Sequence, residues 1–428
     1  MNRYKNSEKF LKRAEAVIPL GSQTFSKSKT QYPVGVSPLF IERAKGVNVW
    51  DIDGNKYTDL VNSLAAVTLG YRNRQVDAAV RKQLKKGVLF SLPAKLEAEV
   101  AEMIVSAVPS AEMVRFAKNG SDATGAAIRL SRAFTGRDEI AFCGYHGWQD
   151  WYIGSTSMNK GVPVSVSNMS HKFQYNKIET LKEIFQKKQD KIAAVILEPM
   201  TSEFPTDNFL LEVKKLTKTN GSILIFDETV TGFRFAKGGA QEEFGVTPDL
   251  TTLGKGIANG FPLSALVGNS EIMSEIKNVF FSGTFGGELL SLAAAKVVLD
   301  FHNNHQITSQ LAFVGNAIAG HVENEIASNG LQDLIGISGH PTWKFLNWFD
   351  TQVVDINYIK TFFLQEMFKR GVLVLGTHNV SWSMKPHDIA KIKDTYSEVF
   401  GEISMKITNG TLLENLFCDP ILPLFKVR

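Results

Sequence analysis

Asp249-Leu-Thr-Thr-Leu-Gly-Lys-Gly-Ile-Ala-Asn-Gly260 places Lys255 between two glycines, directly after a short apolar run. Earlier in the chain, Asp227 closes the apolar run Ile223-Leu-Ile-Phe226, a pattern that is typical of a buried strand. Glycine neighbours allow the backbone around a lysine to approach a ligand closely. A carboxylate at the end of a strand is well placed to meet the same ligand.

This pairing of a lysine with a carboxylate predicts pyridoxal 5′-phosphate as the cofactor. Lys255 would form a Schiff base with the cofactor aldehyde. Asp227 would face the pyridinium nitrogen and keep it protonated, so that the ring can accept electrons from a substrate carbanion.

Strand-like apolar runs alternate with amphipathic segments through the middle of the chain. The strand-like runs are Met113–Ala117, Glu139–Phe142, Ile192–Leu197, Ser222–Phe226 and Ser264–Val267, and the amphipathic segments are 121–134, 178–188 and 208–219. This alternation predicts an α/β fold with crossover helices and a mostly parallel sheet. Because ligands bind at the carboxyl ends of such strands, Ser121, Glu198 and Asp227 are expected to converge on one site.

The two flanks of the chain carry a different pattern. Short alternating runs surround the turn Asp51-Ile-Asp-Gly54, and a helical pattern at 358–370 precedes the apolar run Gly371-Val-Leu-Val-Leu-Gly376. We expect the flanks, 1–60 and 311–428, to build a smaller α+β domain. The large cofactor-binding domain would then span 61–310.

Composition excludes few classes of function. The formal net charge of +4 arises from 47 basic and 43 acidic residues spread along the chain, so it is only weak evidence for a nucleic-acid partner, and an anionic substrate explains it equally well. We expect no nucleic-acid partner. Cys143 and Cys418 are too few for a disulfide framework and fit a reducing compartment. No apolar run approaches the roughly 18 residues that cross a bilayer. We therefore expect a cytoplasmic protein with no membrane partner.

Two glycine-containing turns are candidate phosphate sites. In Asn119-Gly-Ser-Asp-Ala-Thr-Gly125, Gly120 permits close approach of the backbone, and Ser121 lies in the first turn of an expected helix, whose N–H groups favour an anion. A plain helix cap is the simpler alternative. In Phe281-Ser-Gly-Thr-Phe-Gly-Gly287, Thr284 is a second candidate, and an ordinary glycine turn is its alternative.

Gly144-Tyr-His-Gly-Trp148 follows a strand-like run and presents aromatic groups beside a flexible turn. Tyr145 can stack on a planar cofactor, and His146 can hold neighbouring groups in place; ordinary packing is the alternative for both. Cys143 with His146 superficially resembles a metal pair. No further ligands follow at metal-site spacing, so we expect no metal.

Together the motifs resemble the class III aminotransferases, which are fold-type I pyridoxal-phosphate enzymes, and especially their glutamate-1-semialdehyde 2,1-aminomutase-like branch. The matching segments are Phe40-Ile-Glu-Arg-Ala-Lys-Gly46, Val49-Trp-Asp-Ile-Asp-Gly54, Asn119-Gly-Ser121, Ala133-Phe-Thr-Gly-Arg137, Gly144-Tyr-His-Gly147, Phe226-Asp-Glu-Thr-Val-Thr-Gly-Phe-Arg234, Thr247-Pro-Asp-Leu-Thr-Thr-Leu-Gly-Lys255 and Gly283-Thr-Phe-Gly-Gly287. So many ordered matches are highly specific. The resemblance implies a fold-type I architecture, with a seven-stranded-type, mostly parallel sheet in the large domain.

The resemblance also implies roles for individual residues. Lys255 would be the Schiff-base lysine and proton shuttle, and Asp227 would pair with the pyridine nitrogen. The other implied cofactor contacts are Gly120 and Ser121 at the phosphate, Tyr145 and His146 at the ring, and Glu198 nearby.

Two threonines have implied roles that depend on the family more closely. Thr284 would reach the phosphate bound by the partner subunit, because family members are homodimers with shared active sites. Thr229 stands where the family usually has a valine packed beneath the ring. That departure should alter the packing of the ring without threatening the chemistry.

Two further departures bear on the reaction. The aminomutase branch generally has a tryptophan in the segment matched by Asn62-Ser-Leu-Ala-Ala66, where this chain has Leu64. It also has a gating glutamate in a Glu-Ala-Gly-Phe segment, for which the approximate match here is Gly376-Thr-His-Asn379. These departures favour ping-pong transfer from an amino donor to a keto or aldehyde acceptor. The aminomutase reaction is the alternative.

Other possibilities stay open at this stage. A racemase or decarboxylase on the same scaffold, or a catalytically silent relative, would also fit the fold, although the retention of Lys255 and Asp227 argues against silence. A Rossmann dehydrogenase lacks support because no Gly-x-Gly-x-x-Gly turn follows the first strand. Arg234 is a candidate for binding a substrate carboxylate, with an ion pair as its alternative, and Lys27 is another candidate for binding an anion.

Overall fold

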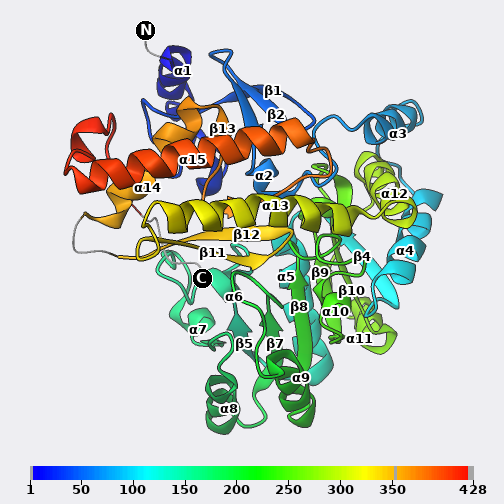
Figure 1. Cartoon of the computed structure of the whole chain (residues 1–428). Helices are drawn as coiled ribbons and strands as arrows, with labels where there is room; N and C mark the ends of the chain where they lie inside the picture. The colour runs from blue at the N-terminus through cyan, green and yellow to red at the C-terminus, as the bar shows by residue number, and fades with distance from the viewer. Residues whose placement is uncertain (1–2, 351–353, 423–428) are drawn as a thin grey trace. The chain divides into compact units, whose positions relative to one another are not determined.

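A computed structural model describes residues 3–350 and 354–422, which form two compact units. Apart from the residues not described, unit 1 comprises Met1–Leu64, Thr68–Asn73 and Ser309–Leu424. Unit 2 comprises Ala65–Val67 and Arg74–Thr308. Figure 1 labels many of the elements of both units.

Unit 2 contains a seven-stranded sheet with the order β4-β10-β9-β8-β7-β5-β6 (Figure 1). Its strands are β4 (Met113–Ala117), β5 (Glu139–Cys143), β6 (Ser170–Lys172), β7 (Ile192–Leu197), β8 (Ile223–Glu228), β9 (Leu250–Leu253) and β10 (Ser264–Gly268). β10 is antiparallel to both β4 and β9, and the other pairings are parallel. The prediction of a mostly parallel α/β sheet is therefore confirmed.

The reversed direction of β10 follows from its connection to β9. Neighbouring parallel strands need a crossover of about a dozen residues or more, usually a helix. Between β9 and β10 the chain forms only the short 3₁₀ helix η3 (Lys255–Ala258). The chain returns at once along the edge of β9, and the Lys255 turn occupies that return.

Helices cover both faces of this sheet. They are α3 (Arg74–Leu84), α4 (Lys95–Ala107), α5 (Gly120–Thr135), α6 (Asp150–Ile153), α7 (Val164–Ser167), α8 (Ile178–Lys187), α9 (Phe209–Thr219), α10 (Ala240–Glu243), α11 (Ser270–Ser274), η4 (Glu275–Lys277) and α12 (Leu289–Asn304). Successive strand residues face opposite sides, so Ile196 of β7 packs in the cluster that contains α5, whereas Val195 packs in the cluster that contains α8 and α9. β7 and β8 are buried at every position, which explains their continuous apolar runs.

Unit 1 contains two smaller sheets, β1-β2-β3-β13 and β11-β12-β14. Their strands are β1 (Ile41–Lys45), β2 (Asn48–Asp51), β3 (Lys56–Asp59), β11 (Ile335–His340), β12 (Trp343–Trp348), β13 (Val372–Leu373) and β14 (Thr377–His378). The unit's helices are α1 (Lys5–Glu15), η1 (Pro19–Gly21), η2 (Phe25–Lys27), most of α13 (Ile307–Ser328), α14 (Ile356–Lys369), α15 (Pro386–Thr408) and η5 (Leu413–Asn415). The apolar run 371–376 forms only the two-residue β13, which pairs in parallel with β3.

The short element α2 (Asn62–Ala65) is a left-handed turn. Its four residues have φ angles of +50°, +51°, +59° and +67°, which place the backbone in the region that L-residues seldom occupy in succession. The carboxylate of Asp59 accepts hydrogen bonds from the backbone N–H groups of Val61 and Asn62 and so supports the start of the turn.

A helix that crosses a bilayer must be about 20 residues long and predominantly apolar. Within residues 3–350 and 354–422, no helix combines the length and the apolar character that a membrane crossing requires.

Candidate active site

Lys255 opens η3 directly after β9 and is partly buried. Its φ angle of +42° is strained for a residue with a side chain, and such strain costs on the order of 1–3 kcal/mol. The preceding glycine leaves little room for a side chain, since a Cβ at Gly254 would lie 3.0 Å from Cγ2 of Thr229. The turn thus brings the lysine backbone close to the end of β8.

Asp227 lies on β8, beside Thr252 of β9, and is 5 % exposed. Its Oδ1 accepts three hydrogen bonds, from Thr229 N at 3.1 Å, Thr229 Oγ1 at 2.6 Å and Thr252 Oγ1 at 2.9 Å. Its Oδ2 lies 2.9 Å from Nδ1 of His146. Burial alone would raise the pKa of Asp227, but the bonds from His146 and Thr229 bring that pKa below its usual value. The site therefore holds a buried, ionised carboxylate.

His146 is buried and is held at both ring nitrogens. Nε2 lies 3.1 Å from the carbonyl oxygen of Cys143, which can only accept, so Nε2 is the donor in that bond. Nδ1 faces Oδ2 of the ionised Asp227, which also can only accept, so Nδ1 is the donor in that bond. The imidazole also stacks on Trp151, with ring centroids 6.0 Å apart and 19° between the planes. These contacts fix the ring and leave it no free nitrogen for a metal.

Glu198 orients the loop that carries Tyr145. It follows β7 and accepts a hydrogen bond from the backbone N–H of Tyr145 at 2.9 Å. Gly144 has a φ angle of +105°, and a Cβ there would lie 2.7 Å from Oε2 of Glu198, so the glycine is needed for this contact. The rings of Tyr145 and Tyr152 are perpendicular, with centroids 5.6 Å apart, and Tyr145 is 37 % exposed.

The first turn of α5 packs against the same loop. Asp122 caps the helix by accepting a hydrogen bond from the backbone N–H of Asn119 at 2.8 Å. Ser121 Oγ accepts one from Trp148 N at 3.3 Å, and a Cβ at Gly147 would lie 2.1 Å from that Oγ. A Cβ at Gly120 would lie 3.0 Å from Thr229 Cγ2. The expected convergence of the segments at Ser121, Glu198 and Asp227 is therefore present in unit 2.

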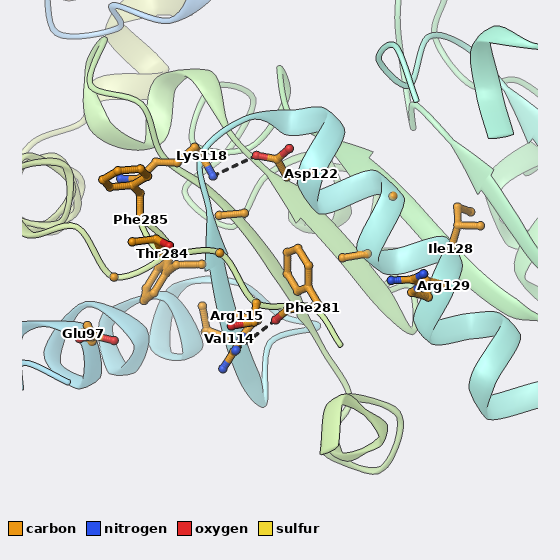
Figure 2. A pocket seen from close by; sticks show the side chains of 18 of the residues that line it. Glu97, Val114, Arg115, Lys118, Asp122, Ile128, Arg129, Phe281, Thr284 and Phe285 are labelled. Carbon is orange, nitrogen blue, oxygen red and sulfur yellow. Dashed lines mark hydrogen bonds between the residues drawn. The ribbon is translucent and has the colours of Figure 1, made fainter. Parts of the chain in front are cut away.

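Thr284 lies elsewhere on unit 2. It is exposed in the loop before α12 and lines a cavity of about 1020 Å³ together with residues of α4, β4 and α5 (Figure 2). In Figure 2, Arg115 reaches the carbonyl oxygen of Phe281, at 3.1 Å, and so supports the loop from β4. Neither Lys255 nor Asp227 lines this cavity.

The two substrate candidates differ in their surroundings. Arg234, in the turn after β8, is 1 % exposed and donates to the carbonyl oxygen of Ala65 at 3.4 Å. Burial lowers the pKa of its guanidinium to about 10. Lys27 is exposed in η2 of unit 1. Their roles in binding substrate stay predictions.

The two departures from the aminomutase pattern are neighbours within unit 1. Leu64 lies in the left-handed turn at α2, and the segment 376–379 contains β14. Asn379 holds the residues just before the left-handed turn. Its backbone N–H donates to the carbonyl oxygen of Leu60 at 2.8 Å, and its Nδ2 donates to the carbonyl oxygen of Val61 at 2.8 Å. Sequence reasoning identified both segments separately, but nothing in it joined them.

Thr252 and Trp151 are contacts of the Asp227–His146 pair that sequence reasoning missed. Thr252 lies on a strand that was not recognised, because Leu-Thr-Thr-Leu carries a weak apolar signal, and its place beside Asp227 depends on strand register. Trp151 belongs to the short helix α6, and only the folded structure reveals that it stacks on His146.

The residues present fit a phosphorylated pyridine cofactor. A buried ionised carboxylate can face a protonated ring nitrogen. The glycines at 120 and 254 leave room where a Cβ would crowd Thr229, and the first turn of α5 has the N–H groups that favour a phosphate. Across the part of the chain that the structure describes, no group of three or more His, Cys, Asp and Glu residues is arranged to hold a metal ion.

Comparison with known proteins gives one family and several relatives. The family model described as "Aminotransferase class-III" matches residues 31–400. A glutamate-1-semialdehyde 2,1-aminomutase from Methanosarcina acetivorans is 36 % identical over 345 residues, which cover 74 % of this chain and 81 % of that protein.

Two solved structures extend the likeness to nearly the whole chain. The FumI protein of Sphingopyxis sp. MTA144, in its PLP internal aldimine form, is 27 % identical with a TM-score of 0.87, covering 97 % of this chain and 99 % of that one. An omega-transaminase from Sphaerobacter thermophilus is 25 % identical with a TM-score of 0.85, covering 95 % of this chain and 100 % of that one.

Proposed function

The chain belongs to the class-III aminotransferase family, and we propose that it transfers an amino group between two separate molecules, an amino donor and a keto or aldehyde acceptor. It is a pyridoxal-5′-phosphate-dependent enzyme, as predicted. The cofactor supplies an aldehyde that captures the amino group and a ring that accepts electrons. The chain supplies position, charge and proton transfer.

The geometry of unit 2 supports each proposed role. Lys255 Nζ holds the cofactor and then moves a proton, because its backbone lies in the close turn beside Gly254. Asp227 presents a carboxylate to the ring nitrogen. Tyr145, which is 37 % exposed, would stack on the ring, and Gly120 with Ser121 would receive the phosphate at the start of α5.

The absence of an acidic side chain from the left-handed turn at α2 and from the segment around β14 supports transfer between molecules. Residues 62–65 and 376–379 contain no carboxylate and no tryptophan, whereas the aminomutase branch places a gating glutamate and a tryptophan in the matching segments. Without a gate, a half-reacted substrate can leave, and a second molecule can then accept the amino group. Ping-pong kinetics follow from this order of events.

The test compares two reactions of the purified enzyme. Amino donors are screened against keto acids and aldehydes, with formation of pyridoxamine phosphate as the readout. In parallel, glutamate 1-semialdehyde is supplied alone and aminolevulinate is measured. We expect transfer in the first assay and little aminolevulinate in the second. Efficient aminolevulinate formation would instead support the aminomutase reaction, which the relative from Methanosarcina acetivorans favours.

We propose a homodimer with shared sites as the working assembly. Phe280 and Phe285 lie in the same loop as Thr284 and are 85 % and 60 % exposed, and monomers seldom leave such apolar surface uncovered. At the end of this loop, the backbone N–H of Leu289 donates a hydrogen bond to the carbonyl oxygen of Val88 at 2.9 Å. Further exposed apolar residues follow Val88 in the chain. A second copy covering this surface would bring Thr284 to its neighbour's phosphate.

A cytoplasmic location also remains part of the proposal. Cys143 and Cys418 are both free thiols, which suits a reducing compartment.

A further inference from the structure

Thr229 touches three parts of the candidate site at once. Its hydroxyl donates to Asp227 Oδ1 at 2.6 Å, and its backbone N–H donates to the same oxygen at 3.1 Å. Its methyl group, Cγ2, would lie 3.0 Å from a Cβ at Gly120 and equally close to one at Gly254. Thr229 therefore lies among the carboxylate, the start of α5 and the lysine turn.

The two oxygens of Asp227 are unequally engaged. Oδ1 already accepts three hydrogen bonds, two from Thr229 and one from Thr252 Oγ1, which fully occupies its acceptor capacity. Oδ2 has a described bond only to His146 Nδ1. One acceptor position thus remains, and it belongs to Oδ2.

We propose that the Thr229 hydroxyl is a positioning group that fixes Asp227 so that Oδ2, rather than Oδ1, is presented to the ring nitrogen of the cofactor. The inference deepens the proposed function and rests on its assignment of Asp227. The hydroxyl does this by locking the carboxylate against rotation about its Cβ–Cγ bond. The bond from the hydroxyl also draws negative charge toward Oδ1. Oδ2 is therefore a weaker acceptor for the hydrogen bond from His146.

Two substitutions separate the hydroxyl from the methyl group. Thr229→Val keeps the shape and removes the hydroxyl, whereas Thr229→Ser keeps the hydroxyl and removes the methyl. Thr231→Val is a matched control, because Thr231 Oγ1 donates at 2.8 Å to a different buried carboxylate, that of Glu228, in the same turn. Thermal unfolding of each apoenzyme checks that the fold is kept.

The first readout is the affinity for pyridoxal 5′-phosphate, measured by equilibrium dialysis on the full-length protein. In Thr229→Val the carboxylate is free to rotate about its Cβ–Cγ bond, and the loss of a fixed Oδ2 is expected to raise Kd about tenfold. Thr229→Ser and Thr231→Val are expected to stay within about threefold of the unsubstituted protein, which is well under that loss.

The second readout uses the apoenzyme and is independent of the cofactor. Proton NMR follows the downfield signal of the His146 Nδ1–H, assigned by its absence in His146→Gln. In Thr229→Val the carboxylate becomes a stronger acceptor, so the signal should move further downfield, and Thr229→Ser should restore it.

The outcomes are distinct. An unchanged Kd and an unchanged signal in Thr229→Val would overturn the proposal, as would equal losses in Thr229→Ser or Thr231→Val. If the unsubstituted protein fails to bind the cofactor through Lys255, the proposed site fails instead, while the NMR comparison still decides whether Thr229 controls Asp227.

Discussion

His146 and Asp227 form a buried pair in which Nδ1 and Oδ2 are 2.9 Å apart. His146 follows β5 and Asp227 lies on β8, with β7 between these two strands in the sheet. The histidine fixes one carboxylate oxygen and two threonines fix the other, so the carboxylate stays ionised although it is buried. Because the Asp227 carboxylate is fixed at both oxygens, substitutions in this site should have distinct effects.

Asp227→Asn should leave cofactor bound but slow proton abstraction. An amide cannot balance the charge of a pyridinium ring, so we expect a loss of about 100-fold in the single-turnover rate, or about 2.7 kcal/mol of barrier. Stopped-flow absorbance on a saturated enzyme measures that rate directly. An unchanged rate would assign Asp227 another role.

Lys255→Ala should abolish turnover while the fold remains. The lysine is the proposed attachment point and proton carrier, and general acid–base catalysis alone contributes roughly 10²–10⁴-fold. The φ angle of +42° is equally strained for alanine, so thermal unfolding should change little. Turnover near the original level, assayed without added amines, would contradict the assignment.

Thr284→Ala should weaken cofactor retention only if the active sites are shared between subunits. Mixing Thr284→Ala subunits with Lys255→Ala subunits then creates heterodimers with one complete site and one site that lacks both groups. Co-assembly should therefore restore activity to a level that neither variant shows alone. Failure to regain activity, or a monomer in analytical ultracentrifugation, would defeat the shared-site proposal.

Glu139→Gln should destabilise unit 2 in a pH-dependent manner. Burial opposes ionisation of Glu139, but bonds from Lys188 at 2.9 Å and His171 at 2.5 Å hold the pKa of its carboxyl below the usual value. A lowered folded pKa contributes stability that is complete above the unfolded pKa and is lost as the pH falls through the folded pKa. Urea unfolding should show a deficit of about 1 kcal/mol at pH 7 that shrinks below about pH 4.

The matched control for this prediction is Glu183→Gln. Glu183 pairs with Lys187 on the surface of α8 at 3.4 Å, and exposed pairs of this kind contribute little. Its unfolding curve should match that of the original protein at both pH values. An equal deficit in both variants would show that loss of any negative charge, rather than the Glu139 cluster, causes the effect.

The sequence by itself determined the class of fold and the edge at which the site forms. The six buried residues of β7, Ile192–Leu197, give an unbroken apolar run because both faces of a parallel sheet are covered by helices. Strands of that kind share a direction, so polar residues after them, such as Glu198, must gather at one edge. The glycines on either side of Lys255 likewise indicate a close backbone approach without reference to any partner.

Only the tertiary structure decided which groups meet within that edge. Thr252 reaches Asp227 because β8 and β9 pair in one register, and a shift of one residue would turn its hydroxyl to the other face. Trp151 stacks on His146, and Asn379 bonds the chain before Leu64, through contacts between distant segments. Local sequence cannot specify such contacts, because side-chain packing and strand register are settled jointly by the whole folded unit.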